Sequence, residues 1–194
     1  MDIDPKWLSR MNRAVPRYTS YPTAPQFRPV DESLYKAHLA RVGNEPVSLY
    51  IHLPFCRTMC LFCGCSTVLN RRPERQTLYL DWLLHEIALV SELVKAPISQ
   101  LHLGGGTPTS LTIAEFDLLL SSLYRSFSFE ETAELSIEID PRTVYSDQGE
   151  KLRALKRLGF NRVSFGVQDL DPKVQEAVKR RQSEEMSRRT FEMA

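Results

Sequence analysis

The stretch YIHLPFCRTMCLFCGC, residues 50–65, decides the fold and contains every cysteine of the 194-residue chain. Its first three cysteines, Cys56, Cys60 and Cys63, have the spacing C-x3-C-x2-C. Three thiolates on one short loop can ligate three irons of a 4Fe–4S cluster, which leaves the fourth iron open to a small molecule. The spacing therefore predicts an iron–sulfur centre.

Other uses of four cysteines remain open at this point. Structural zinc usually takes its ligands as two separated pairs, whereas here all four cysteines, with Cys65 as the last, lie within one short stretch. Two disulfides inside so short a loop would be strained. A zinc site, disulfides and ordinary buried thiols are thus disfavoured by the spacing but not excluded by it.

The composition limits the class of protein. The chain has a net charge of +1 and 42% hydrophobic residues, which suits one domain with an apolar core and gives no sign of nucleic-acid or acidic-membrane binding. Its first residues lack the apolar core of a signal peptide, and no stretch is long and apolar enough to span a bilayer. We expect a cytoplasmic protein, where thiols stay reduced.

Alternation of apolar and polar residues predicts strands over residues 47–53, 98–103, 133–139 and 162–168. Helical spacing predicts helices over residues 31–41, 76–94, 112–124 and 146–158, followed by short helices after Asp171 and Ser183. Strands that alternate with helices indicate βαβ units and a parallel sheet. The proline-rich residues before Pro29 are expected to form an extended arm.

Each predicted strand has one apolar face and one polar face, and the polar faces carry Tyr50, His102, Glu138 and Gln168. A flat sheet covered by helices on both sides would be apolar on both faces. The pattern therefore predicts an α/β fold, a partial (β/α) barrel of about four parallel strands around a polar cavity. The cysteines, the glycine run at 104–106, Glu138 and Gln168 all fall at carboxyl ends of strands, where such barrels carry their chemistry.

Taken singly, these motifs are ambiguous. The run GGGTPT, residues 104–109, is either a flexible turn or a place where backbone approaches a ligand closely. Glu138 is either a solvent-facing acid or an acceptor for ribose hydroxyls, and Gln168 is either a structural amide or a ligand contact. Arg180 lies beyond the last strand, where a surface position is the default and an anion partner is the alternative.

Together the motifs carry a family resemblance. The cysteine spacing with Phe62 before the third cysteine resembles that of radical S-adenosylmethionine enzymes. Five stretches in order resemble the oxygen-independent coproporphyrinogen III oxidase family: PRYTSYPTA (16–24), YIHLPFCRTMCLFCGC (50–65), LHLGGGTPT (101–109), LSIEIDPR (135–142) and GFNRVSFGVQD (159–169).

The resemblance implies roles for individual residues. The ligands of the cluster would be Cys56, Cys60 and Cys63, while Cys65 matches a family cysteine that is not a ligand. One S-adenosylmethionine would chelate the open iron and contact Tyr50, Gly105 and Glu138. A second could lie near Phe62, Gly106, Thr107, Gln168 and Arg180.

The reaction implied is the oxidative decarboxylation of two propionates of coproporphyrinogen III to vinyl groups by a 5′-deoxyadenosyl radical, which gives protoporphyrinogen IX for heme biosynthesis. An unidentified donor would supply the electrons, and we expect a monomer without nucleic-acid or membrane partners. Arg17 and Tyr18 of the arm could contact the substrate. The main alternative is a heme-binding chaperone of the same superfamily, whose members generally lack Cys65 and the PRYTSYPTA stretch; a zinc module and a non-functional fragment are further alternatives.

The resemblance also implies a division of the chain. Residues 1–45 would form the arm and a short helix, and residues 46–194 the amino-terminal part of a barrel that continues further in the family. We therefore expect this chain, expressed alone, to be poorly soluble and inactive, because the far edge of its last strand would lack a partner.

Overall fold

The computed structural model describes residues 6–7, 10 and 23–194. The chain divides into two units, residues 1–36 and 37–194. The first contains the short helix η1 (Ala24–Gln26) and the start of α2 (Glu32–Ala40). The expected substrate contacts of Arg17 and Tyr18 lie outside the described residues. The predicted division of the chain after residue 45 stays a prediction.

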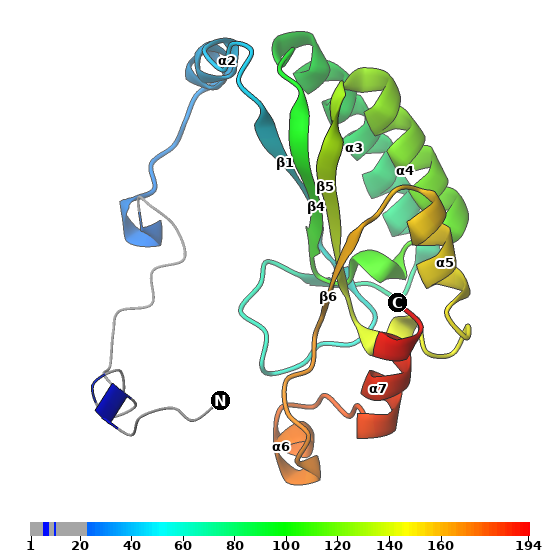
Figure 1. The fold of residues 1–194 in the computed structure, drawn as a ribbon. Coiled ribbons are helices and arrows are strands. Elements are labelled where there is room, and N and C mark those ends of the chain that lie inside the picture. Colours follow the sequence, from blue (N-terminus) through cyan, green and yellow to red (C-terminus); the bar gives the residue numbers. More distant parts are fainter. Residues whose placement is uncertain (1–5, 8–9, 11–22) are drawn as a thin grey trace. The chain divides into compact units, whose positions relative to one another are not determined.

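The second unit contains a four-stranded sheet in which every neighbouring pair is parallel, as the sequence predicts. Its strands, in spatial order, are β1 (Val47–Leu53), β4 (Ile98–Gly105), β5 (Phe129–Ile139) and β6 (Arg162–Phe165). Within the described residues the sheet is open, with β1 and β6 at its edges (Figure 1). Two short strands, β2 (Phe55–Cys56) and β3 (Val68–Leu69), form a separate parallel pair around the cysteine loop.

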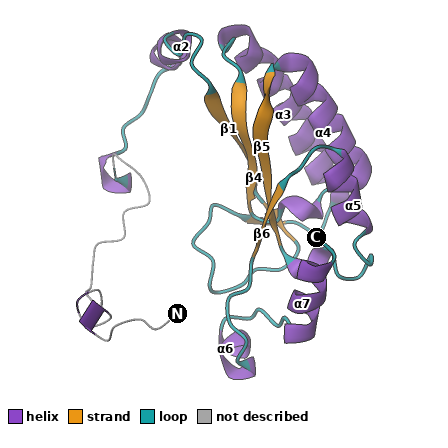
Figure 2. Cartoon of the chain, in the orientation of Figure 1, coloured by secondary structure: helices purple, strands orange, loops and turns teal. Residues whose placement is uncertain are grey.

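Three helices cover one face of the sheet (Figure 2): α3 (Pro73–Leu93), α4 (Ile113–Ser126) and α5 (Glu150–Arg157). The apolar side chains of the strands meet those of the helices in one core, for example Leu101 and Ile137 against Phe116 and Leu120, all of them at most 1% exposed. The opposite face carries the polar residues of the strands. The predicted polarity of the two faces is thereby confirmed.

Several boundaries differ from the sequence prediction. α5 begins at Glu150 rather than at residue 146, because Gln148 and Gly149 have positive φ angles of 53° and 77°, which an α-helix does not accommodate. β6 ends at Phe165 rather than at residue 168, where the chain turns toward α6 (Pro172–Ala177) and α7 (Glu184–Glu192). Side chains cap both of these helices: Asp171 accepts from the amide of Lys173, and Ser183 accepts from that of Met186.

The described helices include none whose length and hydropathy together would suit a bilayer span.

Candidate functional site

The glycine run at the carboxyl end of β4, residues 104–106, packs directly on the start of the cysteine loop. The amide of Gly106 donates to the carbonyl of Leu53 at 2.9 Å, and the amide of Thr107 donates to the carbonyl of Phe55 at 2.9 Å. A Cβ atom on Gly106 would lie 2.7 Å from the carbonyl of Pro54, closer than atoms can approach. Gly105 has a φ of +114°, which side-chain-bearing residues rarely adopt. The glycines therefore let two backbones come into contact.

A cavity of about 270 Å³ lies at the carboxyl ends of β4, β5 and β6; we call it the cofactor cavity. It brings together Cys60 and Cys63 with seven of the eight residues that the resemblance assigns to cofactor binding. These seven are Phe62, Gly105, Gly106, Thr107, Glu138, Gln168 and Arg180. Segments separated by more than a hundred residues thus converge on one site.

Tyr50, the eighth residue, lies beside this cavity on the polar face of the sheet. Its ring stacks on that of His102 at a centroid distance of 5.9 Å, and its hydroxyl is 3.0 Å from Nδ1 of His52. Burial raises the pKa of Tyr50, and the charge of Glu138 raises it further. Tyr50 is consequently a neutral hydrogen-bonding group at neutral pH.

Glu138 is held in place rather than free in solvent. Its Oε2 atom accepts from the amide of Gly105 at 3.2 Å, and its Oε1 atom lies 3.6 Å from Nε2 of His102. The other nitrogen of His102 is 2.7 Å from Oγ of Ser136, so the imidazole is fixed on both sides. With half of its side chain exposed, Glu138 keeps acceptor capacity for the hydroxyl groups of a ligand.

The cysteine loop carries four free thiols. Cys56 is half-buried and its Sγ atom is 3.3 Å from Oγ1 of Thr107, while the amide of Cys65 donates to Sγ of Cys63 at 3.4 Å. Burial raises the pKa of the Cys56 thiol, and the hydrogen bond with Thr107 partly offsets this. Iron takes the thiolate, so a metal bound here would displace that proton.

The donor set of this loop fits an iron–sulfur cluster. Among the described residues, no three His, Cys, Asp or Glu side chains are grouped closely enough to hold one ion. A cluster, by contrast, offers each cysteine a separate iron and does not need the sulfurs to converge on one point. Amide and hydroxyl donors to sulfur, such as those at Cys63 and Cys56, are the contacts that tune such a centre.

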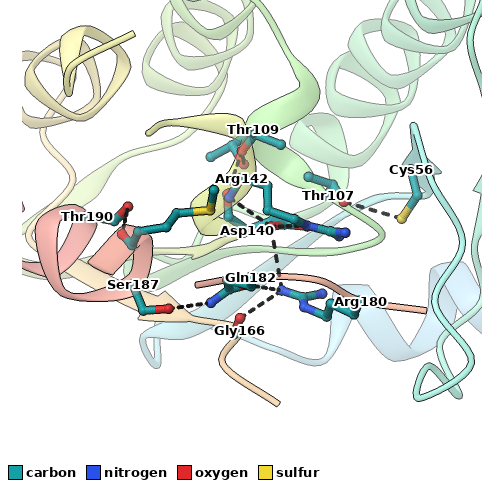
Figure 3. Close-up of polar contacts among 12 residues, drawn as sticks. Cys56, Thr107, Thr109, Asp140, Arg142, Gly166, Arg180, Gln182, Ser187 and Thr190 are labelled. Carbon is teal, nitrogen blue, oxygen red and sulfur yellow. Dashed lines mark hydrogen bonds and ion pairs between the residues drawn. The ribbon is translucent and has the colours of Figure 1, made fainter. Parts of the chain in front are cut away.

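A buried ion network next to the cavity was not foreseen (Figure 3). The Asp140 carboxylate accepts from Arg142 at 2.6 Å and lies 3.6 Å from Nη2 of Arg180, whose guanidinium also donates to the carbonyl of Gly166 at 2.7 Å. Burial would raise the pKa of Asp140, but the hydrogen bonds from Arg142 and the charge of Arg180 outweigh it and hold that pKa below its usual value. The sequence signal was the Asp-Pro-Arg triplet directly after β5.

Arg180 lies in the interior, so the default expectation of a surface position is wrong. The residue is 9% exposed, and its Nε atom is buried without a hydrogen-bond partner among the described residues. It nevertheless lines the cofactor cavity.

The chain resembles known proteins over nearly its whole length. The chain is 43% identical over 187 residues to the oxygen-independent coproporphyrinogen III oxidase of Escherichia coli, which covers 95% of this chain and 40% of the relative. It is 41% identical over 191 residues to the oxidase of the same name from Synechocystis, with 96% and 40% covered. The chain therefore spans about 40% of the length of these curated relatives.

The chain also resembles a solved structure of a protein with this name. Coproporphyrinogen III oxidase from Escherichia coli, a radical SAM enzyme, superposes with a TM-score of 0.86 at 39% identity, covering 100% of this chain and 43% of that one. The family model of the radical SAM superfamily matches residues 50–194, which include the cysteine loop, the glycine run and the carboxyl ends of all four strands of the sheet. The chain belongs to the radical SAM superfamily.

Proposed function

We propose that this chain forms the cluster- and cofactor-binding part of an oxygen-independent coproporphyrinogen III oxidase. The reaction is the oxidative decarboxylation of two propionates of coproporphyrinogen III, which yields protoporphyrinogen IX. One observation carries the proposal: the cofactor cavity gathers Cys60, Cys63 and seven residues expected to bind S-adenosylmethionine. The likeness to proteins of that name supports the choice of substrate.

In this proposal Cys56, Cys60 and Cys63 hold a 4Fe–4S cluster. Cys65 is not a ligand, and only its backbone amide takes part, by donating a hydrogen bond to Sγ of Cys63. When bound, the cluster supplies the electron that cleaves S-adenosylmethionine and so starts hydrogen abstraction from the substrate. The protein would act in the cytoplasm as a monomer, with an electron donor from outside. Its own residues bind, orient and shield the reacting groups.

Three residues hold the first S-adenosylmethionine. The carboxylate of Glu138 accepts hydrogen bonds from the ribose hydroxyls, as its remaining acceptor capacity allows. Gly105 offers its backbone to the ligand; a Cβ atom at this position would meet the protein's own His52 ring at 2.9 Å, so only glycine fits here. Tyr50 presents a neutral hydroxyl at the edge of the site.

A second S-adenosylmethionine is part of the same proposal. The residues assigned to it are Phe62, Gly106, Thr107, Gln168 and Arg180, all of which line the cofactor cavity. The guanidinium of Arg180 and the aromatic ring of Phe62 are suited to a carboxylate and an adenine or sulfonium group, respectively. Asp140 already balances part of the charge of Arg180.

The test uses the protein as the cell makes it, purified without oxygen, and not this 194-residue chain expressed alone, for which we expect no turnover. We expect iron and sulfide in about equal amounts, release of 5′-deoxyadenosine, and conversion of coproporphyrinogen III. Glu138→Gln keeps the cluster but weakens S-adenosylmethionine binding about tenfold or more, since a charge-assisted bond is lost. Glu134→Gln, on the same strand but paired with Arg162, serves as its control. Heme binding without any turnover would contradict the proposal.

The chaperone alternative is not favoured. The relatives reported above are named as oxidases, and Cys65, which heme-binding relatives generally lack, is present.

A further inference from the structure

The cysteine loop borders a second cavity besides the cofactor cavity. This second cavity, of about 490 Å³, is lined by Cys56 together with Arg57, Arg71 and Arg72. The other three cysteines line the cofactor cavity instead. Cys56, one of the three predicted cluster ligands, therefore faces a different side of the loop from Cys60 and Cys63, and that side is rich in arginine.

The three arginines make this side of the loop positively charged. Their side chains are exposed, and none of the ion pairs found among the described residues involves them. Glu115, the acid that lines the cavity, is already engaged by Thr112 and Gln76. The cavity also borders the first turn of the 21-residue helix α3, whose N-terminal partial positive charge is offset in part by the exposed Glu74. The local charge stands out in a chain of net charge +1.

The backbone fixes these arginines relative to Cys56. The amide of Asn70 donates to the carbonyl of Cys56 at 2.8 Å, and the Oδ1 atom of Asn70 accepts from the amide of Arg72 at 3.0 Å. Asn70 is 6% exposed and so forms a buried link between the cysteine and the arginine pair. Leu69, which pairs with Cys56 in the β2–β3 register, is 45% exposed. The strand pair therefore reaches the surface at this cysteine.

We propose that Arg57, Arg71 and Arg72 form the docking surface for a small acidic one-electron carrier protein. This rests on the proposed function, in which the cluster must receive an electron from outside while the cofactor cavity holds S-adenosylmethionine. The carrier gives up one electron and the oxidised cluster accepts it; no bond of this chain forms or breaks. Short-lived electron-transfer complexes have small interfaces, and opposite charges mainly speed their encounter.

The experiment compares two triple variants of equal charge. Arg57→Ser/Arg71→Ser/Arg72→Ser removes the surface, and Arg125→Ser/Lys156→Ser/Arg157→Ser removes three exposed cations from the last turns of α4 and α5. The probe is an acidic flavodoxin, whose binding is followed by the anisotropy of its flavin in dilute buffer and at rising salt. We expect the first variant to bind about tenfold more weakly and to lose most of the salt dependence, while the control stays within about twofold of the parent protein.

A second readout follows reduction of the cluster in a stopped-flow instrument. Reduced flavodoxin should bleach the cluster of the first variant more slowly by a similar factor, whereas dithionite, which needs no docking surface, should reduce all three proteins alike. Equal flavodoxin affinity in the two triple variants, or no salt-dependent binding by the parent protein, would overturn the proposal. If the proposed function is wrong, the purified protein will contain no iron and sulfide. The anisotropy measurement does not need the cluster, so it tests flavodoxin binding in that case too.

Discussion

The Oγ1 atom of Thr107 lies 3.3 Å from Sγ of Cys56, so the glycine run touches the cysteine loop through a side chain as well as through its backbone. The two residues are 51 positions apart and come from different strand ends. A hydroxyl beside a sulfur stabilises negative charge on that sulfur. This contact links the cofactor cavity to the cysteine that faces the arginine surface.

Thr107→Val should lower the reduction potential of the cluster. Valine keeps the shape of this buried side chain but cannot hydrogen-bond to Cys56, so the reduced and more negative state loses stability. A hydrogen bond is worth about 1 kcal/mol, which for one electron corresponds to roughly 40 mV. A redox titration followed by electron paramagnetic resonance measures the shift, and an unchanged potential with full iron content would refute the role of Thr107.

Gly106→Ala should misplace the cysteine loop. Its Cβ atom would lie 2.7 Å from the backbone of Pro54, so one of two tightly hydrogen-bonded segments must move, at a cost of about 1–3 kcal/mol. We expect a lower free energy of unfolding in urea and a lower iron content after reconstitution. Gly64→Ala in the cysteine loop is the matched control, because its Cβ atom would meet nothing within 4 Å. Equal behaviour of the two variants would contradict the packing argument.

Asp140→Asn should destabilise the protein by about 3 kcal/mol near neutral pH, since it leaves Arg142 and Arg180 without their buried counter-charge. The lowered pKa of Asp140 sets the pH dependence: its stabilisation is complete above the ordinary value of 3.8 and is lost as the pH falls through the lower pKa of the folded state. Urea unfolding between neutral and acidic pH should therefore show a smaller acid-induced loss in the variant.

Asp81→Asn is the control for that substitution. Asp81 is exposed on α3 and takes part in none of the ion pairs found among the described residues. Its loss should change the free energy of unfolding by less than about 0.5 kcal/mol. A wild-type-like pH profile in Asp140→Asn would mean that the network does not stabilise the fold.

Much of the sheet and of the site could be predicted from the sequence, because alternation along a strand assigns each side chain to a face. Glu138 and His102 share the polar face for that reason alone. The burial of Arg180 could not be predicted in this way. It depends on contacts with Asp140 and Gly166, which are 40 and 14 residues away in the sequence. It also depends on the end of β6 at Phe165, and the alternation of apolar and polar residues continues past that point.

The part played by the glycines was only half predictable. The sequence indicates that backbone approaches something closely at residues 104–106, and the resemblance suggests a ligand. The structure shows that Gly106 first of all meets the protein itself, at Pro54 and Phe55. Contacts between two loops depend on tertiary geometry that neither loop encodes separately.

The central claim, that three of the four cysteines hold a cluster, is tested most directly by the iron and sulfide content of two variants reconstituted without oxygen. Cys60→Ala should lose most of the iron, the sulfide and the brown absorbance, because one of three ligands is gone. Cys65→Ala should retain all three, because Cys65 offers Cys63 only its amide. Equal loss in both variants, or zinc in place of iron in the unmodified protein, would contradict the account.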